Sequence, residues 1–205
     1  FSENASHEIQ TPLSVIRLKI DQLLQAPVIT GEMAEQLISI SDAASRISRI
    51  NQSLTLLSRI ENRFYNQAGK VNLNALIRNI LEQFQDFREA KGIRSTFTEE
   101  ARIDIEANPD LADVMITNLI NNAIRHNIQG GWIRILLGNQ LVVENTGTDP
   151  GMDPSRLFGR FVKAGNAADS TGLGLSLVQK IAELYGFNIQ YTYADGVHRI
   201  EIALT

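Results

Sequence analysis

The apolar residues in the first third of the chain recur in alternating steps of four and three, and this spacing constrains the fold more than any other feature. The first stripe consists of Ile9, Leu13, Ile16, Ile20 and Leu23. Such spacing places apolar side chains along one side of a helix that packs lengthwise against other helices. We therefore expect a long amphipathic helix that ends before Pro27 and Gly31, two residues that break helices.

A second stripe follows these breakers and predicts a second long helix that ends near Phe64. Its members are Met33, Leu37, Ile40, Ala44, Ile47, Leu54 and Leu57, and Asn51 interrupts it. Two antiparallel helices cannot bury both stripes against each other alone, whereas a four-helix bundle can. We therefore expect a helical hairpin that pairs with a second copy of the chain in a two-fold homodimer.

The pattern changes after a short polar segment, NQAGK at 66–70, to a mixture of helices and strands. Helices are predicted at 72–90, 109–126 and 173–185, and strands at 93–98, 102–106, 132–137, 141–145, 187–193 and 198–204. Turns at Gly138-Asn139 and Asp195-Gly196 predict two antiparallel hairpins. This combination favours an α/β sandwich, so we divide the chain into a helical domain at 1–66 and an α/β domain at 70–205.

The overall composition argues against several classes of protein. The net charge of −4 and the lack of a Lys/Arg cluster disfavour binding of nucleic acid through general phosphate attraction. Cysteine is absent, which excludes a disulfide framework and a thiolate metal site, and the three histidines are scattered. No apolar run reaches the roughly 18 residues that a membrane span requires. The chain begins inside a helical pattern without Met, so we interpret it as a fragment of a longer protein.

The opening segment SHEIQTPL combines residues that are locally poor for helix stability. If the apolar stripe faces inward, His7 faces outward beside Glu8, and Thr11 lies four residues on, on the same face. Pro12 has no N–H, so the carbonyl of Glu8 loses its helical partner and the helix should bend or loosen there. An exposed imidazole beside a carboxylate is a candidate nucleophile with a base or an orienting partner. A lone surface His is more often only a surface residue, so this hypothesis needs support from the second domain.

The predicted helix at 109–126 carries two asparagines on one face. Asn118 and Asn122 are four residues apart, and Arg125 follows one turn later. Asparagine is unfavourable inside a helix unless its amide is used. Amide oxygens can orient phosphate groups and a hard cation such as Mg²⁺, which prefers oxygen ligands, and the guanidinium suits a phosphate. Taken alone, the pattern is more often a polar helix face in solvent.

The segment STGLGLSLVQKI at 170–181 predicts a glycine-rich turn that opens a helix. Backbone N–H groups at a helix N-terminus favour phosphate. Gly172 and Gly174 would let a ligand approach the backbone closely. A Gly-x-Gly pair is weak evidence by itself, and it gains weight from its position downstream of the asparagine pair.

Together these motifs resemble the catalytic core of sensor histidine kinases, in that family's order and over nearly the whole chain. SHEIQTPL resembles the H-E-x-x-T-P phosphoacceptor box. The resemblance implies that His7 receives the γ-phosphoryl group of ATP, that Glu8 acts as general base by accepting the ring Nδ1–H, and that Thr11 positions water for dephosphorylation of the partner. It also implies transfer to an aspartate of a response-regulator receiver domain.

The resemblance implies a nucleotide domain of the Bergerat (GHKL) type with ATP and Mg²⁺ as cofactors. NLINNA at 118–123 is similar to the N box, which assigns Asn122 to Mg²⁺, Asn118 to a supporting contact, and Arg125 and His126 to phosphate or ribose. The glycine segment is similar to the G2 box at the end of an ATP lid over 163–171. Its assigned nucleotide contacts are Thr171, Gly172, Leu173, Gly174 and Leu175, and Lys163, just after the F-box-like LFGRF, is assigned to the phosphates.

One motif departs from the family pattern. The segment VVENTGTDPGM has Asn145, Gly147 and Asp149 where D-x-G-x-G is usual, so Asn145 replaces the aspartate that accepts from the adenine amino group. The amide oxygen can still accept from that amine, but a charge-assisted hydrogen bond is roughly twice as strong as a neutral one. We therefore predict weaker ATP binding than an aspartate would give. His198, in the last predicted strand, is expected to be structural.

The leading interpretation is the cytoplasmic part of an inner-membrane-anchored bacterial sensor, with no nucleic-acid partner and membrane contact only through parts outside this chain. A dimeric signalling scaffold that binds ATP weakly and does not transfer phosphate is the alternative. An ATPase of the gyrase, heat-shock-90 and mismatch-repair group is disfavoured, because it would not need SHEIQTPL on a dimerisation helix.

Overall fold

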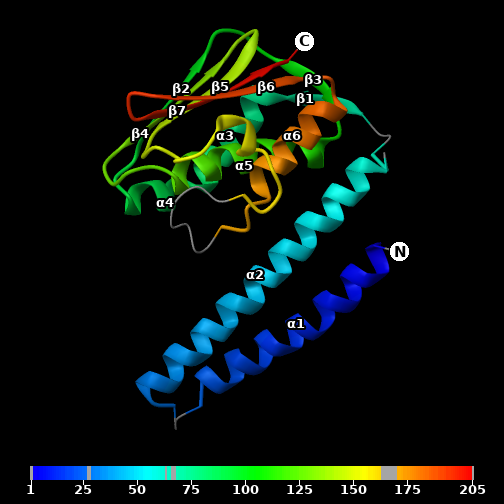
Figure 1. Cartoon of the computed structure of the whole chain (residues 1–205), viewed down its shortest axis with the longest axis vertical. Helices are drawn as coiled ribbons and strands as arrows, with labels where there is room; N and C mark the ends of the chain where they lie inside the picture. The colour runs from blue at the N-terminus through cyan, green and yellow to red at the C-terminus, as the bar shows by residue number, and fades with distance from the viewer. Residues whose placement is uncertain (1, 27–28, 63, 66–67, 163–169, 205) are drawn as a thin grey trace.

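The computed structural model describes residues 2–26, 29–62, 64–65, 68–162 and 170–204, and it describes only the backbone of residues 2–8 and 155. An elongated helical hairpin carries a compact α/β unit at the end of its second helix (Figure 1). Among the described helices, none combines the length and hydropathy that a bilayer crossing requires.

The hairpin consists of α1 (Ser2–Leu24) and α2 (Gly31–Glu61), which pack along each other (Figure 1). Helix α1 continues through Pro12. The hydroxyl of Thr30 caps α2 by accepting from the Met33 N–H at 3.4 Å, which satisfies one of the N–H groups that a helix start leaves without a partner. Leu13 and Ile20 from the first predicted stripe are buried against the partner helix.

A single copy of the hairpin leaves half of the residues in the two predicted stripes exposed, together with some apolar neighbours. Large apolar side chains between 43% and 57% exposed remain on both helices, and they are Ile9, Val15, Ile16, Leu18, Leu23, Met33, Ile38, Ile40 and Ile47. Exposed apolar surface on this scale is typical of an interaction face. One chain alone therefore buries only part of each apolar stripe.

The end of α2 belongs to the core of the α/β unit. Leu57 and Ile60 are 1% and 4% exposed, and they lie in one buried cluster with core residues such as Leu73 and Val178. Helix α2 packs on α6 (Gly174–Leu184), as Figure 1 also shows. An ion pair between Glu61 and Arg160 adds a polar contact to this junction. The core therefore includes a part of the helix that the sequence pattern assigns to the first domain.

A five-stranded sheet in the order β2-β4-β5-β7-β6 forms one layer of the unit. Its strands are β2 (Arg94–Glu99), β4 (Trp132–Leu137), β5 (Gln140–Thr146), β6 (Asn188–Ala194) and β7 (Val197–Ala203). The pair β2–β4 is parallel and the other pairs are antiparallel. Asp195 and Gly196 have φ values of 51° and 77°, which a two-residue type I′ turn requires, so the predicted hairpin at this turn is confirmed.

The helices α3 (Leu73–Gln83), α4 (Gln85–Ala90), α5 (Pro109–Arg125) and α6 form the second layer, below the sheet in Figure 1. The short helix η1 (Pro154–Arg156) follows β5. Helix α5 starts where the sequence predicts, with Asn108 as its cap and Pro109 in its first turn. The single helix predicted over 72–90 is wrong, because the chain ends α3 at Phe84 and begins α4 there.

Two strands that the sequence pattern did not pair form a small second sheet. They are β1 (Gly69–Asn72) and β3 (Asp104–Ala107), which run antiparallel. The last residues of the predicted linker, Gly69 and Lys70, therefore form part of a strand. A four-residue strand gives too short an alternation to distinguish it from a polar loop.

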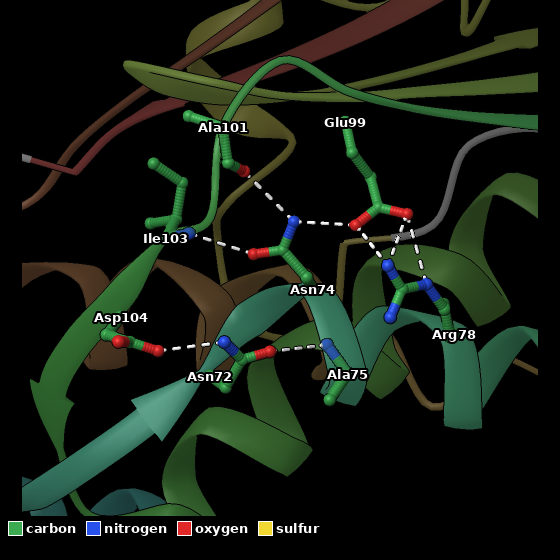
Figure 2. A network of polar contacts seen from close by, with 8 residues as sticks. All are labelled: Asn72, Asn74, Ala75, Arg78, Glu99, Ala101, Ile103 and Asp104. Carbon is green, nitrogen blue, oxygen red and sulfur yellow. Dashed lines mark hydrogen bonds and ion pairs between the residues drawn. The ribbon is translucent and has the colours of Figure 1, made fainter.

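Asparagines at the start of α3 tie this small sheet to the large one (Figure 2). The Asn72 side chain caps α3 through the Ala75 N–H at 2.8 Å and donates to Asp104 at 2.8 Å. The buried Asn74 donates to Glu99 at 2.7 Å and to the Ala101 carbonyl at 3.0 Å. The Arg78 guanidinium, followed by the Asn74 amide, lowers the pKa of Glu99 by hydrogen bonding to its carboxylate.

Candidate functional site

A cleft of about 960 Å³, including its open mouth, lies between α5, the start of α6 and the inner face of the sheet. Nine residues that the sequence analysis singled out line it: Asn118, Asn122, Arg125, His126, Asn145, Thr171, Gly172, Gly174 and Leu175. Segments far apart in the sequence therefore place their predicted residues around one space.

Helix α5 presents its two predicted asparagines to the cleft. Asn118 Nδ2 donates to the Val114 carbonyl at 2.7 Å, a local bond that fixes the amide and leaves Oδ1 as its other polar atom. A Cβ added to Gly174 would lie 2.8 Å from Asn118 Oδ1. Only a glycine therefore lets the start of α6 approach α5 this closely without displacing the amide.

The C-terminal end of α5 is held by a lysine from outside the helix. Lys91 Nζ donates to the carbonyls of Ile124 and Arg125 at 3.0 and 3.2 Å. These contacts satisfy carbonyls that a helix end leaves without partners and place a cation at the negative end of the helix dipole. They fix the main chain where Arg125 and His126 enter the cleft.

The turn before α6 approaches the backbone that follows η1. Gly172 has a φ of 69°, and a Cβ there would lie 2.7 to 2.8 Å from main-chain atoms of Phe161 and Val162. Glycine is required for both reasons, because other residues rarely adopt this φ and no space exists for a side chain. Among the residues that the structure describes, no side chain caps the N-terminus of α6, so N–H groups of its first turn remain for an anion.

Asn145 lies at the end of β5 with 6% of its surface exposed. Its Nδ2 donates to the Thr146 carbonyl at 2.9 Å. Asn145 lines the cleft, and its amide oxygen is left as a hydrogen-bond acceptor. Apolar residues of the lining, Val143 and Ile200 among them, flank this position. An acceptor between apolar walls suits the flat, amine-bearing edge of a nucleobase.

Two histidines that line the cleft are kept neutral by burial. Burial lowers the pKa of His126, and the nearby His198, Arg125 and Lys91 lower it further. Burial also lowers the pKa of His198, while the Thr148 backbone and Asp149 oppose that change. Burial raises the pKa of Tyr191 to about 12, so its hydroxyl stays protonated.

Other predicted residues lie beside the cleft or outside the described parts of the structure. Leu173 is fully buried at the start of α6, and Gly147 follows β5; neither lines the cleft. Lys163 lies outside the described residues. His7 and Glu8 lie on the described backbone of α1, but their side chains are not described, whereas Thr11 is exposed on the same helix.

The sequence analysis missed several residues of the cleft. They are Leu119, Asn121, Ala123, Val143, Pro150, Leu157, Val162, Ser170, Tyr191, His198 and Ile200. Most are apolar residues, and several lie inside the quoted motifs without a role assigned to them. His198 is the instructive case, because the register of β7 against β5 pairs it directly with Asn145. A prediction of strand order, which local patterns do not provide, would have been needed to find it.

Two family models match separate parts of the chain. Residues 1–63 match the His Kinase A (phospho-acceptor) domain, and residues 107–204 match the Histidine kinase-, DNA gyrase B-, and HSP90-like ATPase. The chain belongs to the histidine kinase family. The predicted family and fold class are therefore confirmed, whereas the domain boundaries and the roles of the site residues stay predictions.

This histidine kinase core is similar to named sensors and solved structures. It is 33% identical over 193 residues to the heme sensor protein HssS of Staphylococcus saprophyticus, with 90% of this chain and 41% of that protein covered. The histidine kinase AdeS of Acinetobacter baumannii has a TM-score of 0.66 at 20% identity, with 97% of each chain covered. ShkA in complex with AMPPNP has a TM-score of 0.75 at 19% identity, covering 100% of this chain and 46% of that one. The kinase core thus spans less than half the length of HssS.

The residues present in the kinase core fit ATP. At Gly172 and Gly174 the backbone lies so close to its neighbours that a Cβ would fill the remaining space. The buried amide of Asn145 offers an acceptor to an adenine amine. Among the described residues, no group of three or more His, Asp or Glu side chains could hold a metal ion. A magnesium ion would therefore take most of its ligands from phosphate oxygens and water, which is its usual behaviour beside a nucleotide.

Proposed function

We propose that this chain is the catalytic core of a sensor histidine kinase in a two-component system, which phosphorylates itself on His7 with ATP and passes the phosphoryl group to a response-regulator aspartate. The observation that carries the proposal is one cleft that gathers the two asparagines of α5, the glycine turn before α6 and Asn145. The match of residues 1–63 to a phospho-acceptor domain supports His7 as the acceptor. Dephosphorylation of the same regulator, with Thr11 positioning water, is part of the proposal.

Each wall of the cleft has a separate role in binding. The amide oxygen of Asn145 accepts from the exocyclic amine of adenine, and the apolar walls cover the ring. The first N–H groups of α6, together with Arg125 and the family-assigned Lys163, bind the phosphates. Asn122 would hold Mg²⁺ with the phosphate oxygens, and the ion would neutralise charge that develops on them.

The transfer itself requires little covalent chemistry from the protein, so positioning and charge neutralisation supply most of the catalysis. The Nε2 atom of His7 attacks the γ-phosphorus, the Nε2–P bond forms, and the P–O bond to ADP breaks. Glu8 accepts the hydrogen bond from Nδ1–H, which raises the nucleophilicity of Nε2, and Glu8 takes that proton as the Nε2–P bond forms. The predicted loosening at Pro12 would let α1 adjust as the nucleotide domain reaches His7.

The partners follow from the exposed surfaces and the relatives. The apolar residues left exposed on α1 and α2 would be buried by a second hairpin in a homodimer. A receiver domain would bind near His7. Because the chain spans 41% of the length of HssS, we propose that it works as the cytoplasmic part of a larger, membrane-anchored sensor.

Labelling with γ-³²P-ATP and Mg²⁺ tests the proposal. We expect a label on the chain that is lost in acid and stable in base, as a phosphoramidate is, and that is absent in His7→Ala. His7→Ala should still bind ATP, because the proposal assigns His7 the role of phosphoryl acceptor and no contact that holds the nucleotide. A label that persists in His7→Ala would contradict the assignment of the acceptor.

A second candidate function, a scaffold that binds ATP without transferring phosphate, is favoured by the neutral Asn145 in place of the family aspartate. The same experiment separates the two functions. Binding of ATP without any acid-labile label, even when a dimer is demonstrated by sedimentation, would favour the scaffold. Absence of ATP binding would contradict both.

A further inference from the structure

His198 belongs to a polar row across three strands at the inner end of the cleft. In the sheet register it lies opposite Asn145 on β5 and opposite Tyr193 on β6. Residues directly opposite each other in antiparallel strands share one face of the sheet. The three side chains therefore lie side by side on the face that carries the cleft.

The imidazole of His198 is held in place by two tyrosines. Its Nδ1 lies 2.6 Å from the Tyr191 hydroxyl, and its ring centroid lies 4.9 Å from that of Tyr193. Because the hydroxyl remains protonated, it is available as a hydrogen-bond partner at any physiological pH. A ring that is held at one nitrogen and packed at a tilt against an aromatic side chain has little freedom to rotate.

The other ring nitrogen faces the turn that follows Asn145. His198 Nε2 is buried and forms no hydrogen bond of normal geometry among the described residues, although the Thr148 backbone on this turn lies near enough to raise the pKa of the imidazole. A Cβ added to Gly147 would lie 2.3 Å from this nitrogen and 2.6 Å from the His126 carbonyl. The Gly147 backbone is thus enclosed between the imidazole from β7 and the end of α5.

The same turn is fixed by hydrogen bonds on its other sides. The Gly147 N–H donates to the Gly196 carbonyl at 2.9 Å. The orientation of the Asn145 amide depends on the same turn, because Asn145 Nδ2 donates to the carbonyl of Thr146, the residue before Gly147. A shift of the turn would therefore rotate the Asn145 amide and move its oxygen.

We propose that His198, held by Tyr191, is a positioning residue for nucleotide recognition: it supports the Gly147 turn and so aims the Asn145 oxygen at the exocyclic amine of the purine. This inference rests on the proposed function. It extends base recognition from one asparagine to the row of Asn145, His198 and Tyr193. The amide of Asn145 has to be aimed more accurately than a carboxylate would, because a hydrogen bond to a neutral acceptor is weaker than one to a carboxylate and weakens further when its geometry is poor.

The test compares two ligands, ATP and purine riboside triphosphate, which lacks the 6-amino group. Dissociation constants are measured by calorimetry with Mg²⁺ on the whole chain. Wild type should prefer ATP by about three- to tenfold, the value of one neutral hydrogen bond. In His198→Leu the preference should fall to near unity, because binding of ATP weakens more than binding of the analogue.

Tyr191→Phe provides a milder second variant, because it keeps the ring and removes only the hydroxyl that holds His198. It should lower the preference in the same direction. Thr192→Ala is the matched control, since Thr192 lies between the two tyrosines on β6 but is exposed on the opposite face; it should keep the wild-type preference. A role in folding alone would weaken binding of both ligands equally.

Each other outcome has a definite meaning. A wild-type preference retained in both His198→Leu and Tyr191→Phe would overturn the inference and leave the proposed function standing. Equal affinity of wild type for the two ligands would overturn it as well, because no amine would then be recognised. Failure of wild type to bind either ligand would overturn the proposed function together with the inference.

Discussion

At the scale of single residues, Asn145 suits its surroundings better than the family aspartate would. In Asn145→Asp, a carboxylate oxygen would replace the Nδ2 that donates to the Thr146 carbonyl at 2.9 Å, and two acceptors would face each other. We expect the free energy of unfolding without nucleotide to fall by about 1–3 kcal/mol. Affinity for ATP should rise by up to about tenfold, because the remaining oxygen makes a charge-assisted bond.

Urea unfolding without nucleotide and calorimetric titration with ATP measure the two effects of Asn145→Asp separately. Asn121→Asp is a suitable control, since it adds the same charge to the cleft lining away from the predicted amine contact. A loss of affinity in Asn145→Asp but not in Asn121→Asp would contradict the orientation assigned to the amide.

The buried histidines predict a stability that depends on pH. Burial lowers the pKa of His126 and His198 below 6.5 in the folded chain. As the pH falls, these histidines bind protons in the unfolded chain before they do so in the folded chain. The contribution of the two neutral histidines to the free energy of unfolding is therefore fully present above pH 6.5 and is lost as the pH falls below it. Glu99 and Asp104 have pKa values lowered from 4.5 and 3.8, so their contribution is lost only in a more acidic window.

Urea unfolding followed by the fluorescence of Trp132, the single tryptophan of the chain, checks this prediction at pH 7.5 and about 5.5. The free energy of unfolding should fall between these values in wild type and fall less in the double variant His126→Gln, His198→Gln. An equal fall in the double variant would assign the effect to other groups.

At the scale of elements, the network in Figure 2 joins the start of α3 to both sheets, through Asn72 on Asp104 and Asn74 on Glu99. Asn74→Ala removes the partners of the Ala101 carbonyl and of the Ile103 N–H, which Asn74 Oδ1 accepts at 2.8 Å. We expect the free energy of unfolding to fall by about 1–3 kcal/mol, because the three hydrogen bonds of the buried Asn74 side chain are lost.

Arg78→Ala is the matched control for Asn74→Ala, because it breaks an ion pair to the same Glu99 from a side chain that is 55% exposed. Exposed pairs contribute less than about 1 kcal/mol, so this variant should be nearly neutral in urea unfolding. If both variants lost the same amount, the main-chain contacts of Asn74 would not be the important part of the network.

At the scale of the whole molecule, the junction between hairpin and α/β unit is a packed core rather than a linker. Leu57, on α2, is 1% exposed within that core. Leu57→Ala should lower the free energy of unfolding of the α/β unit by about 2–5 kcal/mol, because it creates a cavity. Trp132 on β4 reports this transition, although Leu57 lies on the hairpin helix.

Ile38→Ala is the control, since Ile38 lies on the same helix, is 50% exposed and is absent from the core cluster. Ile38→Ala should leave the free energy of unfolding unchanged when unfolding is followed by the fluorescence of Trp132. An unchanged transition in Leu57→Ala would mean that α2 ends outside the folding unit of the nucleotide domain.

Local patterns predicted much of the architecture because their information lies within a few neighbouring residues. The two hairpins depend on turn residues such as Asp195 and Gly196, whose φ values the turn requires. Helix α5 depends on its cap and on Pro109. The end of α3 at Phe84 was missed, since no Gly or Pro marks it and the apolar periodicity continues.

The amino-acid sequence by itself determined the long helical stripes, most of the strands and the family motifs, because periodicity, turn chemistry and motif spacing are local properties. Only the tertiary structure decided which strands pair, and therefore that β2 lies parallel to β4 and that His198 faces Asn145. It also decided that the end of α2 completes the α/β core. These contacts join distant residues through burial and sheet register, which no local pattern specifies.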